Sequence, residues 1–265
     1  MSALLVSHDG PVVTFTINRP ESRNPLGEPG DGDLFAEACA KVNADARVRC
    51  VILTGAGRAF SAGGNVKAMR ERSGSFAGPG VAIRETYRNG IHRMVRALWE
   101  LEVPAIAAVN GPAIGLGNDV ACLCDMRIAA ESAIFGATFL KIGLIPGDGG
   151  AWLLPKVIGH ARAAELLYAG TTIDAATAER WGLVSRVVPD AVLMEEARAL
   201  AVRIAAQPPH ALRMAKRLLR QGIGATFDQI LELSAAMQAL AHHTEDHAEA
   251  VDAFFGKRPG TFHGR

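Results

Sequence analysis

The stretch VPAIAAVNGPAIGLGND, residues 103–119, combines a buried strand with an unusual strand end. Its apolar residues after Pro104 are typical of a strand covered on both faces. The strand ends in two glycines that flank Leu116, followed by Asn118 and the carboxylate of Asp119. A simple turn does not require this composition. The stretch therefore predicts a strand end that leaves backbone N–H groups uncovered beside an acid.

A second stretch, GRAFSAGGNVKAM at 57–69, has the same organisation. The apolar strand CVILTGA precedes it, and the small-residue turn SAGGN leads into a predicted helix. Two N–H groups aimed at one carbonyl oxygen would form an oxyanion hole, in which each donor is typically worth ~3–4 kcal/mol. The alternative is two ordinary strand-to-helix turns, because short glycine motifs are weak signals. Neither stretch has the spacing of a Rossmann fingerprint or a P-loop.

Strands and helices alternate along most of the chain. Alternating β-branched and polar residues predict a strand at 12–17, and Asp33 is a plausible N-cap for the first helix. Helical spacing predicts helices at 34–45, 85–101, 161–170, 175–183, 193–206, 208–221 and 226–255. This order predicts a layered α/β core over 1–192 and a helical region over 193–265.

The composition limits the class of protein. Of the 265 residues, 49% are hydrophobic and 21% are charged, which suits a globular chain with a sizeable core. The formal net charge of +1 gives no reason to expect nucleic acid as a partner. The four cysteines have neither CxxC nor zinc spacing, which favours reduced side chains. We expect no signal peptide and no membrane span, and we place the protein in the cytoplasm.

The chain as a whole resembles the crotonase superfamily, which is the enoyl-CoA hydratase/isomerase family. The motifs that carry the resemblance are NRPESRNPL, GAGRAFSAGGNVKAM, residues 103–150, AERWGLVSRVVP and FFGKRPGTFHGR. The resemblance implies a spiral of ββα turns with a C-terminal helical region used in trimer formation. It also implies an acyl-CoA thioester as substrate, no separate cofactor, and assembly as a homotrimer or a dimer of trimers.

The family pattern assigns roles to the two glycine corners. It implies that the N–H groups of Gly64 and Leu116 hold the thioester oxygen, so that a proton can leave Cα or a nucleophile can add at Cβ. The residues that it implies in CoA binding are Ala62, Gly64, Lys67, Leu116, Lys257 and Arg258. Lys67 is equally consistent with a solvated helix, and Lys257 and Arg258 with a basic tail. The acyl pocket would be lined by residues 70–100.

The acids depart from the family pattern. Hydratases of the family hold a water between two glutamates, and these positions are Asp119 and Phe139 here. Phe139 cannot exchange a proton, which argues against plain hydration. Asp148 in IPGDGG is the candidate replacement, although family isomerases carry their aspartate one position earlier, at Gly147. The alternative role for Asp148 is to cap the helix that begins AWLLPKVIG.

Two reactions stay open on this evidence, the hydration of a 2-enoyl-CoA and the isomerisation of a double bond. Both would use Asp119, Asp148, Gly64 and Leu116 as catalytic groups. A non-catalytic or scaffold protein that binds CoA and has lost the second acid is the alternative from another functional class.

Several other polar residues have simpler interpretations. Asn65 is expected to be a turn residue, and His92 is an outside candidate for a proton shuttle. His243 and His247 lie four apart in a predicted helix, but without a recognised motif they indicate a polar helix face, and we predict no metal. A basic helix face without acids, expected to be solvated, comprises Arg213, Lys216, Arg217 and Arg220.

Overall fold

The computed structural model describes residues 2–265. Its largest sheet has six strands in the order β1-β2-β4-β6-β8-β11, and only the β1–β2 pair is antiparallel. These strands are β1 (Leu4–Asp9), β2 (Val12–Ile17), β4 (Cys50–Gly55), β6 (Ala105–Val109), β8 (Met126–Ala130) and β11 (Arg186–Val188). Every residue of β4 and β6 is buried, which explains their uninterrupted apolar sequences.

Short strands form a second layer. They are β3 (Pro25–Leu26), β5 (Gly63–Gly64), β7 (Ala113–Ile114), β9 (Ile134–Gly136) and β10 (Thr172–Asp174). They pair as β3–β5 and as β10-β9-β7. Four strands of the large sheet are each followed by a short strand and then a helix, as in β6-β7-α5. The predicted spiral of ββα turns is therefore confirmed.

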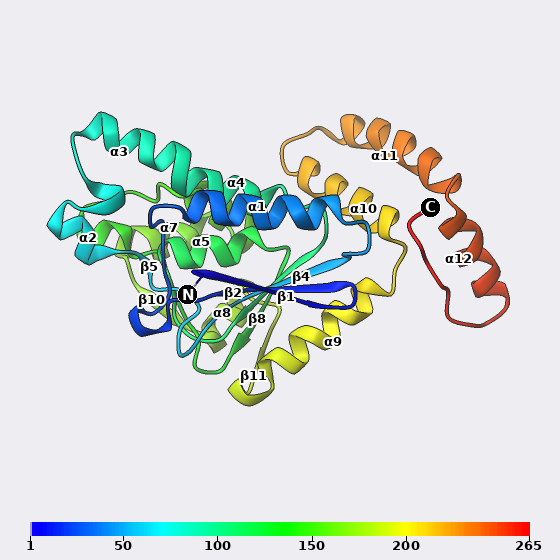
Figure 1. The fold of residues 1–265 in the computed structure, drawn as a ribbon, viewed down its shortest axis with the longest axis horizontal. Coiled ribbons are helices and arrows are strands. Elements are labelled where there is room, and N and C mark those ends of the chain that lie inside the picture. The colour runs from blue at the N-terminus through cyan, green and yellow to red at the C-terminus, as the bar shows by residue number, and fades with distance from the viewer. Residues whose placement is uncertain (1) are drawn as a thin grey trace.

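Helices cover both faces of the large sheet (Figure 1). In the α/β part they are α1 (Asp31–Ala44), α2 (Val66–Glu71), α3 (Gly80–Thr86), α4 (His92–Trp99), α5 (Leu116–Leu123), α6 (Gly150–Ile158), α7 (His160–Ala169) and α8 (Ala175–Trp181). Single turns lie at η1 (Pro20–Ser22), η2 (Gly74–Phe76), η3 (Tyr87–Ile91), η4 (Thr138–Ile142) and η5 (Asp190–Val192). Phe35 of α1 and Met94 of α4 are in the main core with Phe15 of β2.

The C-terminal helices are α9 (Leu193–Ala205), α10 (Pro209–Gly222), α11 (Phe227–His242) and α12 (Glu245–Phe255). Helix α9 packs its apolar side against the opposite face of the sheet, where Ala197 and Ala201 meet Ile52 and Ile106. Helices α11 and α12 project beyond the α/β body (Figure 1). A helical end of the chain is thus confirmed, while the boundary at residue 192 stays a prediction. Within residues 2–265, no helix is long and apolar enough to cross a bilayer.

Three helix predictions are wrong in detail. Helix α1 begins at Asp31 after Gly30, so Asp33 lies inside the helix, where it pairs with an arginine of α4. The helix predicted at 85–101 is divided by a π turn, η3. The helix predicted at 226–255 is interrupted because Thr244 caps α12, accepting a hydrogen bond from the His247 N–H at 3.1 Å. As a consequence, His243 and His247 do not share one helix.

Candidate active site

The two glycine corners lie directly against each other. The Ser61 N–H donates to the Pro112 carbonyl at 3.0 Å, and the Ile114 N–H donates to the Ser61 carbonyl at 2.9 Å. A Cβ on Gly117 would clash with the Ser61 carbonyl, and one on Gly63 would clash with the Ile114 carbonyl. The glycines therefore serve first to let the two corners pack on each other. This contact between the corners is a role that the sequence does not reveal.

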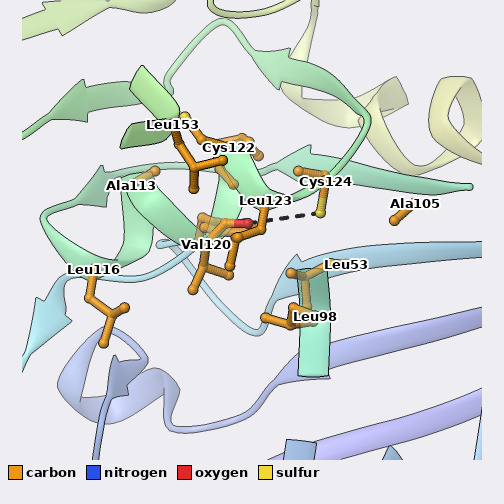
Figure 2. Close-up of a cluster of buried hydrophobic side chains, with 14 of the residues drawn as sticks. Leu53, Leu98, Ala105, Ala113, Leu116, Val120, Cys122, Leu123, Cys124 and Leu153 are labelled. Atoms are coloured by element: carbon orange, nitrogen blue, oxygen red, sulfur yellow. Dashed lines mark hydrogen bonds between the residues drawn. The ribbon is translucent and has the colours of Figure 1, made fainter. Parts of the chain in front are cut away.

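The backbone N–H of Leu116 is available for a ligand. Gly115 has φ 55° and ψ −120°, a conformation that favours glycine, and α5 begins at the next residue. As the first residue of the helix, Leu116 has no acceptor for its N–H within α5, and it has none elsewhere in residues 2–265. Figure 2 shows the side chains of Val120 and Leu123 of α5 within a cluster of buried hydrophobic residues, and every residue of this helix is buried, so core packing holds the helix in place.

Gly64, the other predicted donor, ends β5 beside this corner. It pairs in parallel register with Leu26 and is half-buried. A Cβ on its neighbour Gly63 would lie 3.4 Å from the Leu116 nitrogen, so Gly64 and Leu116 belong to one small region. The structure thus brings the two predicted oxyanion residues together.

Asp119 lies on the first turn of α5 and is 1% exposed. One carboxylate oxygen, Oδ2, accepts from the Gly150 N–H at 3.1 Å, while Oδ1 has no partner among the described residues. Burial, and secondly the charge of Asp148, raise the pKa of Asp119 to about 8. The side chain is therefore predominantly protonated near pH 7.

Asp148 does not cap α6. That helix begins at Gly150, its N-cap is Gly149, and no side chain makes a capping hydrogen bond. The Asp148 side chain is instead 5% exposed, and its Oδ1 has no partner within residues 2–265. Burial raises its pKa to about 6, although the charge of His92 acts in the opposite direction. The capping interpretation is wrong, and the carboxyl group is buried near Asp119.

Phe139 lies in η4 at the same corner. Its ring is 3.6 Å from the position that a Cβ on Gly115 would occupy. An apolar ring thus adjoins the turn that leads to Leu116, at the place where the resemblance puts a second glutamate.

Two cavities adjoin α2. One, of about 560 Å³, is lined by polar and small residues that include Arg19, Ala62, Gly64 and Asn65. The other, of about 660 Å³, has a largely apolar lining: Met69, Phe76, Ile83, Tyr87, Ile142 and Leu144 are among its residues. The second cavity lies largely within the segment 70–100 that was expected to line an acyl pocket.

The remaining predictions near α2 have mixed outcomes. Asn65 is a turn residue as predicted, because its Oδ1 caps α2 by accepting from the Ala68 N–H at 3.0 Å. Lys67 is 81% exposed and lies 3.9 Å from Glu71, which leaves its role in CoA binding a prediction.

The basic face of α10 is not free of acids. Lys216 is 5% exposed, and its Nζ lies 2.8 Å from Asp125 Oδ2 and 2.7 Å from the Val103 carbonyl. Arg220 also pairs with Asp125, and Arg213 pairs with Glu102. The prediction of a solvated basic face is wrong for Arg213, Lys216 and Arg220, because acids from distant segments pair with them, whereas Arg217 is exposed as predicted.

The C-terminal candidates lie apart from this site within one chain. Lys257 and Arg258 follow α12, and Arg258 pairs with Glu249 at 2.6 Å. His242 Nδ1 and His247 Nε2 are 3.0 Å apart. Residues 2–265 contain no group of three or more side chains that could hold a metal ion.

Comparison with known proteins decides the family. The family model described as enoyl-CoA hydratase/isomerase matches residues 8–265. This chain belongs to the enoyl-CoA hydratase/isomerase family. It is 38% identical over 266 residues to 1,2-epoxyphenylacetyl-CoA isomerase of Escherichia coli K12, and 34% identical over 265 residues to 2,3-dehydroadipyl-CoA hydratase of the same strain. Both matches cover 100% of each chain.

Solved structures agree with this assignment. The crystal structure of enoyl-CoA hydratase from Bacillus anthracis superposes with a TM-score of 0.93 at 34% identity, over 100% of both chains. The protein is therefore an enzyme of the enoyl-CoA hydratase/isomerase family. Hydratases and an isomerase match it at similar identity, so similarity alone does not choose the reaction.

The sequence pattern does not identify one residue that lies at this candidate site. Tyr87 lines the apolar cavity, and its ring contacts His92 edge-on with centroids 5.9 Å apart. Burial, and secondly the charge of Asp148, raise the pKa of Tyr87. No sequence signal identifies it, because the π turn that aims Tyr87 at the site is absent from the helical pattern of residues 85–101.

Proposed function

We propose that this enzyme isomerises a 3-enoyl-CoA to a 2-enoyl-CoA, moving the double bond of the acyl group from C3–C4 to C2–C3. The observation that carries the proposal is the pair of buried acids. Asp148 and Asp119 are both buried, and each carboxyl group has an oxygen without a partner among residues 2–265. Phe139 lies where the resemblance puts the second, water-binding glutamate. Such a pair suits the removal of a proton at one carbon and its return at another.

The proposed reaction begins with the thioester oxygen at the N–H groups of Gly64 and Leu116. As charge develops on this oxygen, each donor supplies roughly 3 kcal/mol. The ionised Asp148 removes a proton from Cα, the electron pair shifts along the chain, and the protonated Asp119 delivers its proton to Cγ. The Cα–H bond breaks and a Cγ–H bond forms, with no oxidant, reductant or cofactor. Proton transfer between the two acids, or through solvent, resets the site.

The two cavities support a placement for the substrate. The CoA arm would follow the cavity lined by Ala62 and Gly64, and the acyl group would enter the apolar cavity behind Met69. Lys67 would meet the CoA phosphates. Lys257 and Arg258 would contact the nucleotide bound by a neighbouring protomer, since they are carried on helices that project beyond the body.

The proposed assembly is a homotrimer or a dimer of trimers, and the proposed compartment is the cytoplasm. Exposed aromatic side chains on the projecting helix α12, Phe254 and Phe255, support the burial of this part of the chain between protomers. The four buried free cysteines are compatible with a reducing compartment.

The test is the fate of a 3-enoyl-CoA and of crotonyl-CoA in D2O, followed by mass spectrometry. We expect double-bond migration with deuterium at Cα and Cγ and without a hydrated product. Asp119→Asn and Asp148→Asn should each abolish migration. Asp9→Asn, a change at an exposed carboxylate that pairs with Arg198, is the matched control and should not alter it.

Other outcomes would refute the proposal in distinct ways. A 3-hydroxyacyl-CoA product that depends on Asp119 would identify a hydratase that works with one acid. If the wild type binds CoA but changes neither substrate, the scaffold alternative gains support. Phe139→Glu sharpens the comparison, because restoring a second acid at this position should add hydration that the wild type lacks.

A further inference from the structure

The segment 145–148 contains one of the two buried acids, yet it has few attachments to the rest of the protein. Its Ile145 is 74% exposed, and the glycines on either side, Gly143 and Gly149, have φ of 71° and 98°. The Gly147 N–H bonds only within the segment, to Ile145 O. Within residues 2–265, one hydrogen bond joins the segment to another element: His92 Nε2 lies 2.8 Å from the Gly147 carbonyl oxygen.

The acceptor in this contact determines which ring nitrogen of His92 carries a proton. A carbonyl oxygen can only accept a hydrogen bond, so Nε2 must carry the proton. The carbonyl that it holds belongs to the peptide unit that leads directly into Asp148. The orientation of this peptide therefore sets the direction in which the Asp148 side chain leaves the backbone.

The π turn η3 is the reason why His92 reaches this loop together with Tyr87. In an α-helix, residues five apart point in directions that differ by about 140°. Here the His92 N–H donates to the Tyr87 carbonyl, which closes an i→i+5 turn and brings the two rings into edge contact. Tyr87 Cε1 lies 3.6 Å from the position of a Cβ on Gly147. One ring thus covers Gly147 while the other holds its carbonyl.

We propose that His92 is a positioning residue, whose Nε2–H holds the Gly147 carbonyl and thereby keeps the Asp148 carboxyl group turned toward Asp119. The proposal rests on the proposed function, because it assigns His92 a role only through Asp148. Loss of the contact should leave the binding of CoA intact, since His92 is on α4 and the two oxyanion N–H groups are on β5 and α5. Misplacement of a catalytic group by about 1 Å can cost on the order of 10²-fold in rate.

The experiment compares His92→Phe, which keeps a ring without a donor, with His92→Gln, which keeps an N–H donor. Hydrogen–deuterium exchange of a peptide covering 143–149 reports the attachment of the loop, independently of turnover. Steady-state kinetics on the 3-enoyl-CoA report catalysis. We expect His92→Phe to accelerate exchange in the loop and to lower kcat roughly 10²-fold with KM unchanged. His92→Gln should keep loop exchange and kcat close to their wild-type values. His160→Phe, a change at an exposed histidine of α7, should alter neither the exchange nor kcat.

Each contrary result has its own meaning. Unchanged loop exchange and kcat in His92→Phe would overturn the proposal. Equal losses in His92→Phe and His92→Gln, with a lowered melting temperature and a raised KM, would show a structural role only and would also overturn it. If the wild type isomerises neither substrate while His92→Phe still loosens the loop, the proposed function fails and the positioning role falls with it, but the contact of His92 with the loop stands.

Discussion

The stability of the protein should depend on pH through Asp119, and the size of this effect follows from the burial of its carboxyl group. The ordinary pKa of 3.8 is raised to about 8 in the folded protein. Between these values the unfolded chain has released the proton and the folded chain still binds it. The folded state therefore binds one proton more, and its stability falls by about 1.4 kcal/mol for each unit of pH rise. Below about pH 4 and above about pH 8 the contribution of Asp119 is constant.

Asp119→Asn removes this titration while nearly preserving the shape of the side chain. We expect the stability of the wild type relative to this variant to fall by roughly 4 kcal/mol between about pH 5 and pH 8. Asp148 and the histidines titrate in both proteins, so their contributions to the pH dependence cancel in the difference between the two stabilities. One polar atom of the asparagine side chain also lacks a hydrogen-bond partner. This changes the free energy of unfolding of the variant by an amount that does not vary with pH.

Urea denaturation at a series of pH values and at equal protein concentration measures the difference. Asp9→Asn is the control, and its curve should run parallel to that of the wild type across the window. A difference between wild type and Asp119→Asn that stays constant from about pH 5 to pH 8 would show that the carboxyl group is already ionised in the folded protein. The assignment of Asp119 as the acid would then be wrong.

Three further predictions follow from the same geometry. The kcat/KM for isomerisation should be bell-shaped in pH, rising as Asp148 ionises near 6 and falling as Asp119 ionises near 8, in a stopped assay of double-bond migration. Gly117→Ala should abolish activity, because its Cβ would clash with the carbonyl of the other corner, whereas Gly224→Ala, with nothing within 4 Å, should not change the initial rate. Asp125→Ala should lower the free energy of unfolding by roughly 3–5 kcal/mol, because the buried ammonium group of Lys216 loses its carboxylate partner. Urea denaturation measures this, and an unchanged midpoint of unfolding would contradict it.

Local pattern was sufficient for much of the fold. The strand at 12–17 was predictable because β-branched and polar residues alternate along it, and the strand at 50–55 because a strand buried on both faces is mostly apolar. The interruption at Thr244 was not, because the amphipathic pattern continues across it and only the capping side chain reveals the break. The partners of the basic α10 face were equally hidden. Asp125 is 95 residues from Arg220, a separation that no local pattern reports.

The candidate site shows the same division. Leu116 and Asp119 could be located from the sequence, because a strand, a glycine turn and a helix start are all local features. The burial of Asp148 could not, since this residue lies in a loop whose hydrogen bond to α4 joins residues far apart in the sequence. The sequence leaves two roles open for this residue, a helix cap and a catalytic acid, and only the start of α6 after Gly149 excludes the first.

The arrangement of the acids also gives a physical reason for preferring isomerisation. Hydration needs a water held between two groups, and the ring of Phe139 offers neither a hydrogen bond nor a proton at that position. The two aspartates instead share a buried region in which ionising both is unfavourable, so that near pH 7 one is charged while the other is neutral. A pair in these opposite states can remove one proton and supply another without recruiting water. This property is what a double-bond shift requires, and the substitution at Phe139 leaves it intact.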